Sequence, residues 1–212
     1  MIKQGNIKLA CFDMDGVIFQ ERNFWLSLHK TFGTYTLGKN LTKKYVNSDY
    51  EKLVEEVVHK LWKGKDATKY FELVKGSRYI PGVRETFSEL RRRGIKTAIV
   101  SSGPTHLALR AQKELGIECV YSNELVVNNN RISGEFKWPI GHGNKTKIVK
   151  TLSRKLGIRM AKVAFVGEGE NDIEVCKAVG LSISFNSESK RLDDVCDLVI
   201  KRRDLREILK QL

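Results

Sequence analysis

Residues 7–16 read Ile7-Lys8-Leu9-Ala10-Cys11-Phe12-Asp13-Met14-Asp15-Gly16. The first six residues are mostly apolar and predict a short buried strand, which ends at two carboxylates and a glycine. A strand that ends in this way presents polar side chains at the carboxyl edge of a sheet, where open α/β proteins bind their ligands. The stretch therefore predicts the first strand of the fold and one part of its functional site.

Two more apolar stretches end in polar clusters. Ile95–Val100 leads into Ser101-Ser102-Gly103, and Lys162–Val166 leads into Gly167-Glu168-Gly169-Glu170-Asn171-Asp172. Strand-like and helical segments alternate from residue 82 onward, which indicates a parallel sheet with helices on both faces. Since parallel strands end at one edge, we expect the three polar clusters to share one crevice.

Residues 18–78 look mostly helical and contain no clear strand. Tyr50–Trp62 repeats apolar residues at helical spacing, and Pro81-Gly82 marks the return to the alternating pattern. We therefore expect a three-layer, Rossmann-like α/β core domain formed by residues 1–17 and 79–212. Residues 18–78 are expected to form a helical cap domain inserted after the first strand.

The remaining elements follow from the same patterns. Asn128-Asn129-Asn130 predicts a hairpin turn between two strand-like segments. We expect helices at about 82–93, 105–115 and 145–156, short strands at about 119–121, 181–185 and 197–200, and a last helix near the end.

Composition narrows the classes of function. Of the 212 residues, 41% are hydrophobic and 30% are charged, which is typical of a soluble globular protein. No apolar run approaches the roughly 18 residues of a membrane helix. The first six residues contain no apolar segment of the secretory kind, so we expect a cytoplasmic protein without a membrane partner.

The four cysteines form no CxxC pair and are expected to be reduced, buried thiols: Cys11, Cys119, Cys176 and Cys196.

The net charge is +13, from 38 Lys and Arg against 25 Asp and Glu. The basic residues are scattered apart from Arg91-Arg92-Arg93 and Lys201-Arg202-Arg203, so the pattern argues against a nucleic-acid partner. Two explanations stay open: a solvated Lys/Glu-rich surface, and a positive field that attracts small anions. A monomer and a homodimer are both compatible with the sequence.

The expected crevice contains an excess of negative charge. Four carboxylates would repel one another strongly unless a cation joined them. Mg²⁺ is a hard cation that binds oxygen ligands and commonly accompanies phosphate. Lys145 begins a helix soon after the hairpin and can supply a second positive charge.

The order of these clusters resembles the four motifs of the haloacid dehalogenase (HAD) superfamily. The matching segments are Asp13-Met14-Asp15-Gly16, Ile99–Gly103, Lys145 and Gly167–Asp172, and within the superfamily the chain is most similar to the phosphoserine phosphatase branch. The resemblance covers nearly the whole core. It implies a HAD-like fold with a small helical C1-type cap. It also implies a Mg²⁺-dependent phosphatase that hydrolyses a small phosphorylated metabolite through an aspartyl-phosphate.

The resemblance further implies a role for each matching residue. Asp13 is the expected nucleophile, and Asp15 is the expected general acid and base. The expected phosphate- and substrate-binding residues are Ser101, Ser102, Gly103, Lys145, Asn171 and Arg22. The expected metal site consists of Asp13, the backbone carbonyl of Asp15, Glu168 and, through bound water, Asp172.

The chain departs from the family pattern at two places. Glu168 stands where the fourth motif usually begins with aspartate, which predicts activity with a metal preference shifted toward Mn²⁺. Arg22 stands where the branch has a substrate-reading glutamate, with Glu21 one residue away. Val57 lies near the position of an expected cap arginine. Phosphoserine is therefore the family-level expectation, and phosphoglycolate or a sugar phosphate is the alternative substrate.

Two other classes of function stay open. A phosphotransferase or mutase would use the same aspartyl-phosphate but pass the phosphoryl group to another acceptor. A catalytically silent, basic nucleic-acid-binding or regulatory protein could keep the fold without the reaction. The presence of Asp13, Asp15, Ser101 and Lys145 together favours an active enzyme.

Overall fold

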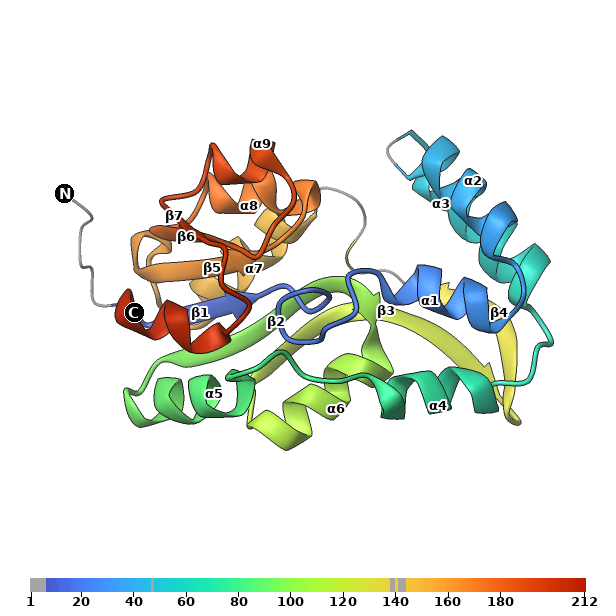
Figure 1. The fold of residues 1–212 in the computed structure, drawn as a ribbon, viewed down its shortest axis with the longest axis horizontal. Helices are drawn as coiled ribbons and strands as arrows, with labels where there is room; N and C mark the ends of the chain where they lie inside the picture. The colour runs from blue at the N-terminus through green and yellow to red at the C-terminus, as the bar shows by residue number, and fades with distance from the viewer. Residues whose placement is uncertain (1–6, 47, 138–139, 141–143) are drawn as a thin grey trace.

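The computed structural model describes residues 7–46, 48–137, 140 and 144–212 (Figure 1). Within these residues, seven strands form one sheet in the order β4-β3-β2-β1-β5-β6-β7. Every neighbouring pair is parallel except β3 and β4, which are antiparallel. The strands are β1 Leu9–Phe12, β2 Lys96–Pro104, β3 Cys119–Asn128, β4 Arg131–Lys137, β5 Val163–Gly167, β6 Leu181–Phe185 and β7 Leu198–Ile200.

The helices fall into two groups along the chain. Those between β1 and β2 are α1 Phe24–Thr31, α2 Tyr35–Tyr45, α3 Tyr50–Val54, the π-helix η1 Glu55–Trp62, α4 Thr68–Gly76 and α5 Val83–Arg92. Those after β2 are α6 Thr105–Leu115, α7 Lys145–Lys155, η2 Met160–Lys162, η3 Glu170–Asp172, α8 Ile173–Cys176, α9 Lys190–Asp193 and η4 Leu205–Lys210.

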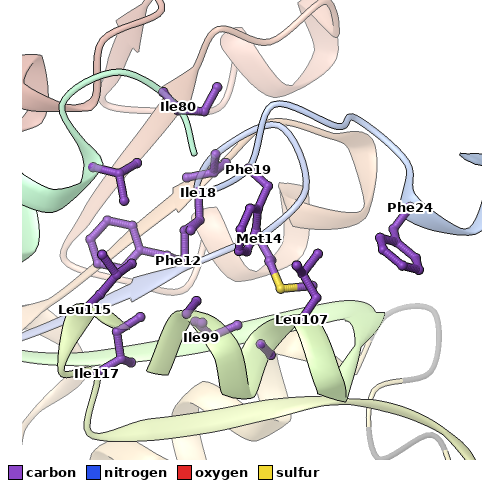
Figure 2. Packing of buried hydrophobic residues seen from close by; sticks show 14 of the residues in the cluster. Phe12, Met14, Ile18, Phe19, Phe24, Ile80, Ile99, Leu107, Leu115 and Ile117 are labelled. Atoms are coloured by element: carbon purple, nitrogen blue, oxygen red, sulfur yellow. The ribbon is translucent and has the colours of Figure 1, made fainter. Parts of the chain in front are cut away.

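The central strand β1 shows why the molecule has three layers. Successive side chains of a strand point to opposite faces, so Ala10 and Phe12 face one side and Leu9 and Cys11 face the other. Ala10 and Phe12 belong to a core cluster shared with α5 and α6, part of which is drawn in Figure 2. Leu9 and Cys11 belong to a second cluster, shared with α7 and α8. The predicted α/β fold, a mainly parallel sheet covered by helices on both faces, is confirmed.

Three elements differ from the sequence-based expectation. Strand β2 continues through Ser101 to Pro104, because Pro104 pairs with Asn123 of the neighbouring strand. Strand β3 runs unbroken from Cys119 to Asn128 and turns into β4 through Asn129 and Asn130, both with positive φ, so the predicted hairpin is present. The last helix, η4, is a 3-10 helix rather than an α-helix.

The segment from α1 to α4 is helical, as expected, and is joined to the β3–β4 hairpin. In Figure 1 these helices and the hairpin lie together at the right of the view. Backbone hydrogen bonds connect Gly64 to Ile132 at 2.8 Å and Ala67 to Asn130 at 2.8 Å. The division of the chain into a core and a cap domain at residues 18 and 78 stays a prediction.

The helix expected over Tyr50–Trp62 is present, but its second half has π geometry. The Lys63 N–H donates to the Val58 carbonyl at 3.0 Å, five residues back. The wider turn allows the adjacent Val57 and Val58, together with Trp62, to be buried. π turns inside helices are often found at functional sites.

The four cysteines differ in how far they are buried. All four cysteines are free thiols, but only Cys11 and Cys176 are buried, while Cys119 and Cys196 are half-buried. They were all expected to be buried; Cys119 begins a strand, and Cys196 follows the end of a helix near the sheet edge.

In the described part of the chain, no helix has the length and apolar character needed to cross a membrane.

His29 is a buried histidine in the helical segment. Its ring lies 4.6 Å from the Trp62 ring, between centroids, and its Nδ1 is 2.8 Å from Thr34 Oγ1. Burial lowers the pKa of His29 to about 4. The folded state therefore holds this imidazole neutral at pH values where an exposed histidine takes up a proton.

His29 should make the protein less stable as the pH falls from about 6.5 to about 4. In this window the unfolded chain binds a proton at His29 and the folded chain does not, so acid favours unfolding. In His29→Gln, the loss of thermal stability on acidification should be smaller than in the wild type. Melting temperatures measured at several pH values check this, with His59→Gln, at an exposed position, as the control. An identical pH dependence in His29→Gln and wild type would contradict the assignment.

Candidate active site

The polar clusters predicted from the sequence meet at one edge of the sheet. β1 pairs with β2 on one side and with β5 on the other, so Asp13 and Glu168 directly follow two neighbouring strands and Ser101 lies in the last part of the third. The chain passes from β1 to β2 in one direction and later places β5 on the opposite side. Such a reversal of strand order opens a crevice at the carboxyl edge.

Asp13 is the residue directly after β1, and its carboxylate is held at both oxygens. The Met14 N–H donates to Oδ1 at 2.7 Å, and Lys145 Nζ lies 2.8 Å from Oδ2. The Asp13 backbone N–H donates to the Val166 carbonyl at 2.9 Å, which continues the β1–β5 pairing. The side chain is buried, although it still lines the crevice. These contacts give the carboxylate one fixed orientation.

Lys145, the first residue of α7, joins two carboxylates. Its ammonium lies 2.8 Å from Asp13 Oδ2 and 2.6 Å from Asp172 Oδ1, with only 4% of the side chain exposed. Burial alone lowers the pKa of Lys145, but the two carboxylates outweigh it and hold the pKa above its usual value. The lysine is therefore charged and provides a permanent positive centre at the floor of the site.

Asp172 orders the loop after β5. Its Oδ2 accepts hydrogen bonds from the Glu168 N–H at 3.0 Å and the Gly169 N–H at 3.2 Å. A side chain on Gly167 would collide with it, since a Cβ there would lie 2.5 Å from Asp172 Oδ2. Asp172 is fully buried, and its two hydrogen bonds position the backbone at Glu168 and Gly169.

Asp15 has the environment of a proton-transfer group. Its Oδ2 accepts from the Phe24 N–H at 2.8 Å, at the start of α1. Its Oδ1 is buried and finds no hydrogen-bond partner among the described residues. Burial, with a smaller effect of the Asp13 and Glu168 charges, raises the pKa of Asp15 to about 7. A carboxyl group with a pKa near neutrality can both donate and accept a proton at physiological pH.

Glu168 and Arg22 form an ion pair at the mouth of the site. Arg22 Nη1 lies 2.9 Å from Glu168 Oε2, and Arg22 Nη2 donates to the Asn186 carbonyl at 3.0 Å. Burial, then the charge of Asp13, raises the pKa of Glu168 to about 7, while Arg22 acts in the opposite direction. Gly16, at φ +71, leaves room for this carboxylate, because a Cβ there would lie 2.9 Å from Glu168 Cδ.

The donor set suits a hard divalent cation. The four carboxylates of Asp13, Asp15, Glu168 and Asp172 outnumber Lys145 and Arg22, the cations that pair with them among the described residues. One oxygen of Asp15 is also buried without a hydrogen-bond partner in that part of the chain. Oxygen donors with excess negative charge are what Mg²⁺ requires. Within the described ranges, no three His, Cys, Asp or Glu side chains already stand in a metal-holding arrangement.

Ser101 and Gly103 lie in the last part of β2. Ser101 Oγ is buried and accepts from the Gly103 N–H at 3.1 Å. Gly103 is closely covered, since a Cβ there would lie 2.5 Å from Met14 Cε. Helix α6 begins directly after Pro104, so its first N–H groups point toward the same edge of the sheet and favour an anion there.

A polar cavity of about 600 Å³ brings most of the predicted site residues together. Its lining includes Asp13, Asp15, Arg22, Ser101, Ser102, Glu168 and Asn171. Lys145 and Asp172 are outside this lining and are connected to it through Lys145, which pairs with both Asp13 and Asp172. Trp25, from the helical segment, also lines the cavity, and its Nε1–H donates to the Ser102 carbonyl at 2.9 Å.

Sequence reasoning missed two residues that shape the site. Asn23 caps α1 by accepting from the Leu26 N–H at 3.0 Å, which fixes the helix start that binds Asp15. An asparagine before an apolar helical run is the signal that could have found it. Asn123 is fully buried, and its amide donates to the carbonyls of Ser102 and Ile140 at 3.2 and 3.1 Å. No local pattern marks Asn123, because its partners are far away in the sequence.

Comparisons with known proteins agree with this geometry. A family model described as haloacid dehalogenase-like hydrolase matches residues 7–180. The phosphoserine phosphatase of Archaeoglobus fulgidus is 31% identical over 201 residues, which are 93% of this chain and 58% of that protein. The phosphoserine phosphatase of Methanocaldococcus jannaschii is 28% identical over 208 residues, which are 97% of each chain.

Solved structures extend the likeness to three dimensions. A phosphoserine phosphatase with an analogue of the phospho-aspartyl intermediate superposes with a TM-score of 0.86 at 27% identity, over 98% of this chain and 100% of that one. A substrate-bound phosphoserine phosphatase has the same TM-score and identity, over 98% and 99% of the two chains. The resemblance predicted from the motifs is confirmed.

Lys145→Met should destabilise the protein, because it leaves Asp13 and Asp172 as close, buried carboxylates without a cation. Removing one partner of a buried ion pair costs about 3–5 kcal/mol in the free energy of unfolding. Urea unfolding measures the loss, and Lys145→Met/Asp172→Asn should recover part of it. Lys147→Met, at an exposed position of the same helix, is the matched control. Equal stability of Lys145→Met and Lys147→Met would show that the buried charge centre does not exist.

Proposed function

Since the chain belongs to the haloacid dehalogenase-like hydrolases and is a phosphatase of the phosphoserine phosphatase type, we propose that Asp13 is its nucleophile and that small phosphate monoesters are its substrates. The observation that carries this proposal is the fixed carboxylate of Asp13. It lies at the carboxyl edge of the sheet, beside a charged lysine and a carboxyl group with a raised pKa.

In the first proposed step, a carboxylate oxygen of Asp13 attacks phosphorus and the bond from phosphorus to the ester oxygen breaks. Protonated Asp15 gives its proton to the departing alkoxide, so a neutral alcohol leaves and an aspartyl-phosphate remains. Lys145, Ser101 and the first N–H groups of α6 would hold the phosphoryl oxygens. Their positive charge and dipoles oppose the negative charge of the transferred group.

In the second proposed step, ionised Asp15 takes a proton from a water molecule whose oxygen attacks phosphorus. The acyl–phosphate bond breaks, inorganic phosphate leaves and the Asp13 carboxylate is restored. Asp15 thus returns to its protonated form for the next cycle. Its pKa of about 7 supports both roles, because neither form is strongly disfavoured near neutral pH.

We propose Mg²⁺ as the cofactor, held by Asp13, Glu168 and the backbone carbonyl of Asp15, with Asp172 supporting its bound water. A cation at this place would reduce repulsion between the carboxylates and the phosphoryl group. The oxygen-rich donor set supports the assignment. The shifted metal preference expected from Glu168 stays a prediction.

The substrate is proposed as a small anionic ester. The named activity of the relatives supports phosphoserine, while Arg22 beside the site suits other small acid or sugar phosphates. The net charge of +13 would attract any such anion from a distance.

Residues 18–78, as a cap, would exclude water from the reaction. A cytoplasmic location and a monomeric or homodimeric state stay predictions.

Asp13→Asn should reduce phosphate release on the order of 10³-fold or more, because the amide is a poor nucleophile. Phosphate release from phosphoserine and p-nitrophenyl phosphate, with and without Mg²⁺, measures the effect. Asp194→Asn makes the same chemical change at an exposed position and should keep wild-type activity. Hydrolysis that survives in Asp13→Asn would refute Asp13 as the nucleophile.

Arg22→Gln should bind Mg²⁺ about fivefold more tightly, since an exposed ion pair of about 1 kcal/mol no longer competes for Glu168. The Mg²⁺ dependence of the melting temperature measures this without any substrate. Arg191→Gln is the matched control, because Arg191 lines the same cavity but pairs with Glu170 at 3.0 Å. If both variants changed Mg²⁺ affinity equally, only the general loss of positive charge would be responsible.

A further inference from the structure

A second cavity, of about 150 Å³, opens beside the polar one and is lined by α1, α3, η1 and β4 (Figure 1 shows these elements). We infer that this cavity receives the leaving group of the substrate. The enzyme would then prefer phosphate monoesters of alcohols that carry an aromatic ring or an alkyl group of similar size. The inference rests on the proposed function, because it assigns the part of the substrate that departs from phosphorus.

The wall of this cavity is apolar. Side chains from several separate parts of the chain form it, and its apolar members include Val54, Val57, Val58, Trp62, Phe136 and Ile140. Val58, Trp62 and Ile140 are almost completely buried in the folded protein. Because such a wall offers no compensation for lost hydration, it favours an apolar occupant.

The apolar cavity is continuous with the phosphate end of the site. Both cavities are lined by Asn23, Trp25, Val46, Ser102 and Asn171. Lys145, which contacts Asp13, also reaches the apolar cavity. An ester whose phosphorus lies at Asp13 can therefore direct its alcohol portion into this space.

Four of the polar side chains around the apolar cavity already have hydrogen-bond or ion-pair partners. Asn23 Oδ1 accepts from the Leu26 N–H, Trp25 Nε1–H donates to Ser102, and His29 Nδ1 is paired with Thr34 Oγ1. Lys145 bridges two carboxylates. The remaining surface of Trp25 and His29 is a ring face, which packs well against apolar groups.

A zwitterionic leaving group fits this lining poorly. Among the described lining residues, Lys145 alone carries a charge, and it is already paired twice. Within this described lining, the α-amino group of serine would find no carboxylate, and the α-carboxylate would find no cation other than Lys145. Burying charges without partners is costly, whereas burying a ring or alkyl group is favourable.

The size of the cavity matches a single ring. An apolar engineered cavity of about 150 Å³ binds benzene. The present cavity has the same volume and is supported by aromatic contacts that give it a defined shape. Trp25 lies 6.1 Å from Trp62 and 5.4 Å from Phe136, between ring centroids.

Three substrates test the inference: ethyl phosphate, 2-phenylethyl phosphate and O-phosphoserine. The first two esters release alcohols of similar acidity, so a difference in their kcat/KM values reports binding of the phenyl ring. Serine is the most acidic of the three alcohols, so phosphoserine has the best leaving group. Leaving-group ability alone would therefore give a ranking opposite to the one that the inference predicts. We expect kcat/KM for 2-phenylethyl phosphate to exceed that for each of the other two at least tenfold.

Val54→Trp should fill the cavity and bring the kcat/KM ratio of 2-phenylethyl phosphate to ethyl phosphate close to one. Val199→Trp makes the same change on the exposed face of β7 and should keep the wild-type ratio. If Val54→Trp does not fold, Val57→Asn replaces it, because it adds an amide to the lining at similar side-chain volume. That variant should also lower the ratio.

Each outcome separates this inference from the proposed function. Phosphoserine turnover equal to or better than that of 2-phenylethyl phosphate would overturn the inference and leave the phosphatase intact. An unchanged substrate ratio in Val54→Trp would overturn it as well. Failure to hydrolyse any of the three esters with Mg²⁺ present would overturn the proposed function and the inference with it.

Discussion

The site depends on the two ion pairs that the buried ammonium group of Lys145 forms with Asp13 and Asp172. It joins the residue after β1, the first residue of α7 and the residue that orders the loop after β5. Two buried carboxylates could not stay this close without a cation, since both would lose hydration and repel each other. The same charge centre therefore holds three distant segments together and orients the carboxylate of Asp13.

The helical segment between β1 and β2 also forms hydrogen bonds with residues of the candidate site. The N–H that begins α1 binds Asp15, and the indole of Trp25 binds the Ser102 carbonyl. Burial by these residues raises the pKa of Asp15, while the hydrogen bond from Phe24 limits the rise. A carboxyl group at the end of an exposed strand would stay ionised at neutral pH. The helical segment after β1 is thus part of what makes Asp15 a candidate acid and base.

Local signals explain how much of this architecture could be predicted from the sequence. Short apolar runs that end in Asp, Ser or Glu predicted β1, β2 and β5 and the edge where they meet. The Asn128–Asn130 turn was equally readable, because asparagine tolerates positive φ. The continuation of β2 to Pro104, the ion pair of Arg22 with Glu168 and the buried Asn123 all depend on partners distant in sequence. No local pattern could supply them.

In the proposed complex, the charge of the chain and the lining of its apolar cavity would act on different parts of the substrate. A net charge of +13 and the ammonium of Lys145 would attract the phosphate, which every phosphate monoester carries. They cannot distinguish one ester from another, so selectivity must come from the wall that meets the alcohol. The π turn of η1 matters here, because it brings the adjacent Val57 and Val58 into the same buried wall as Trp62. If the alcohol portion enters the apolar cavity, its shape and hydration would contribute to the selection among esters.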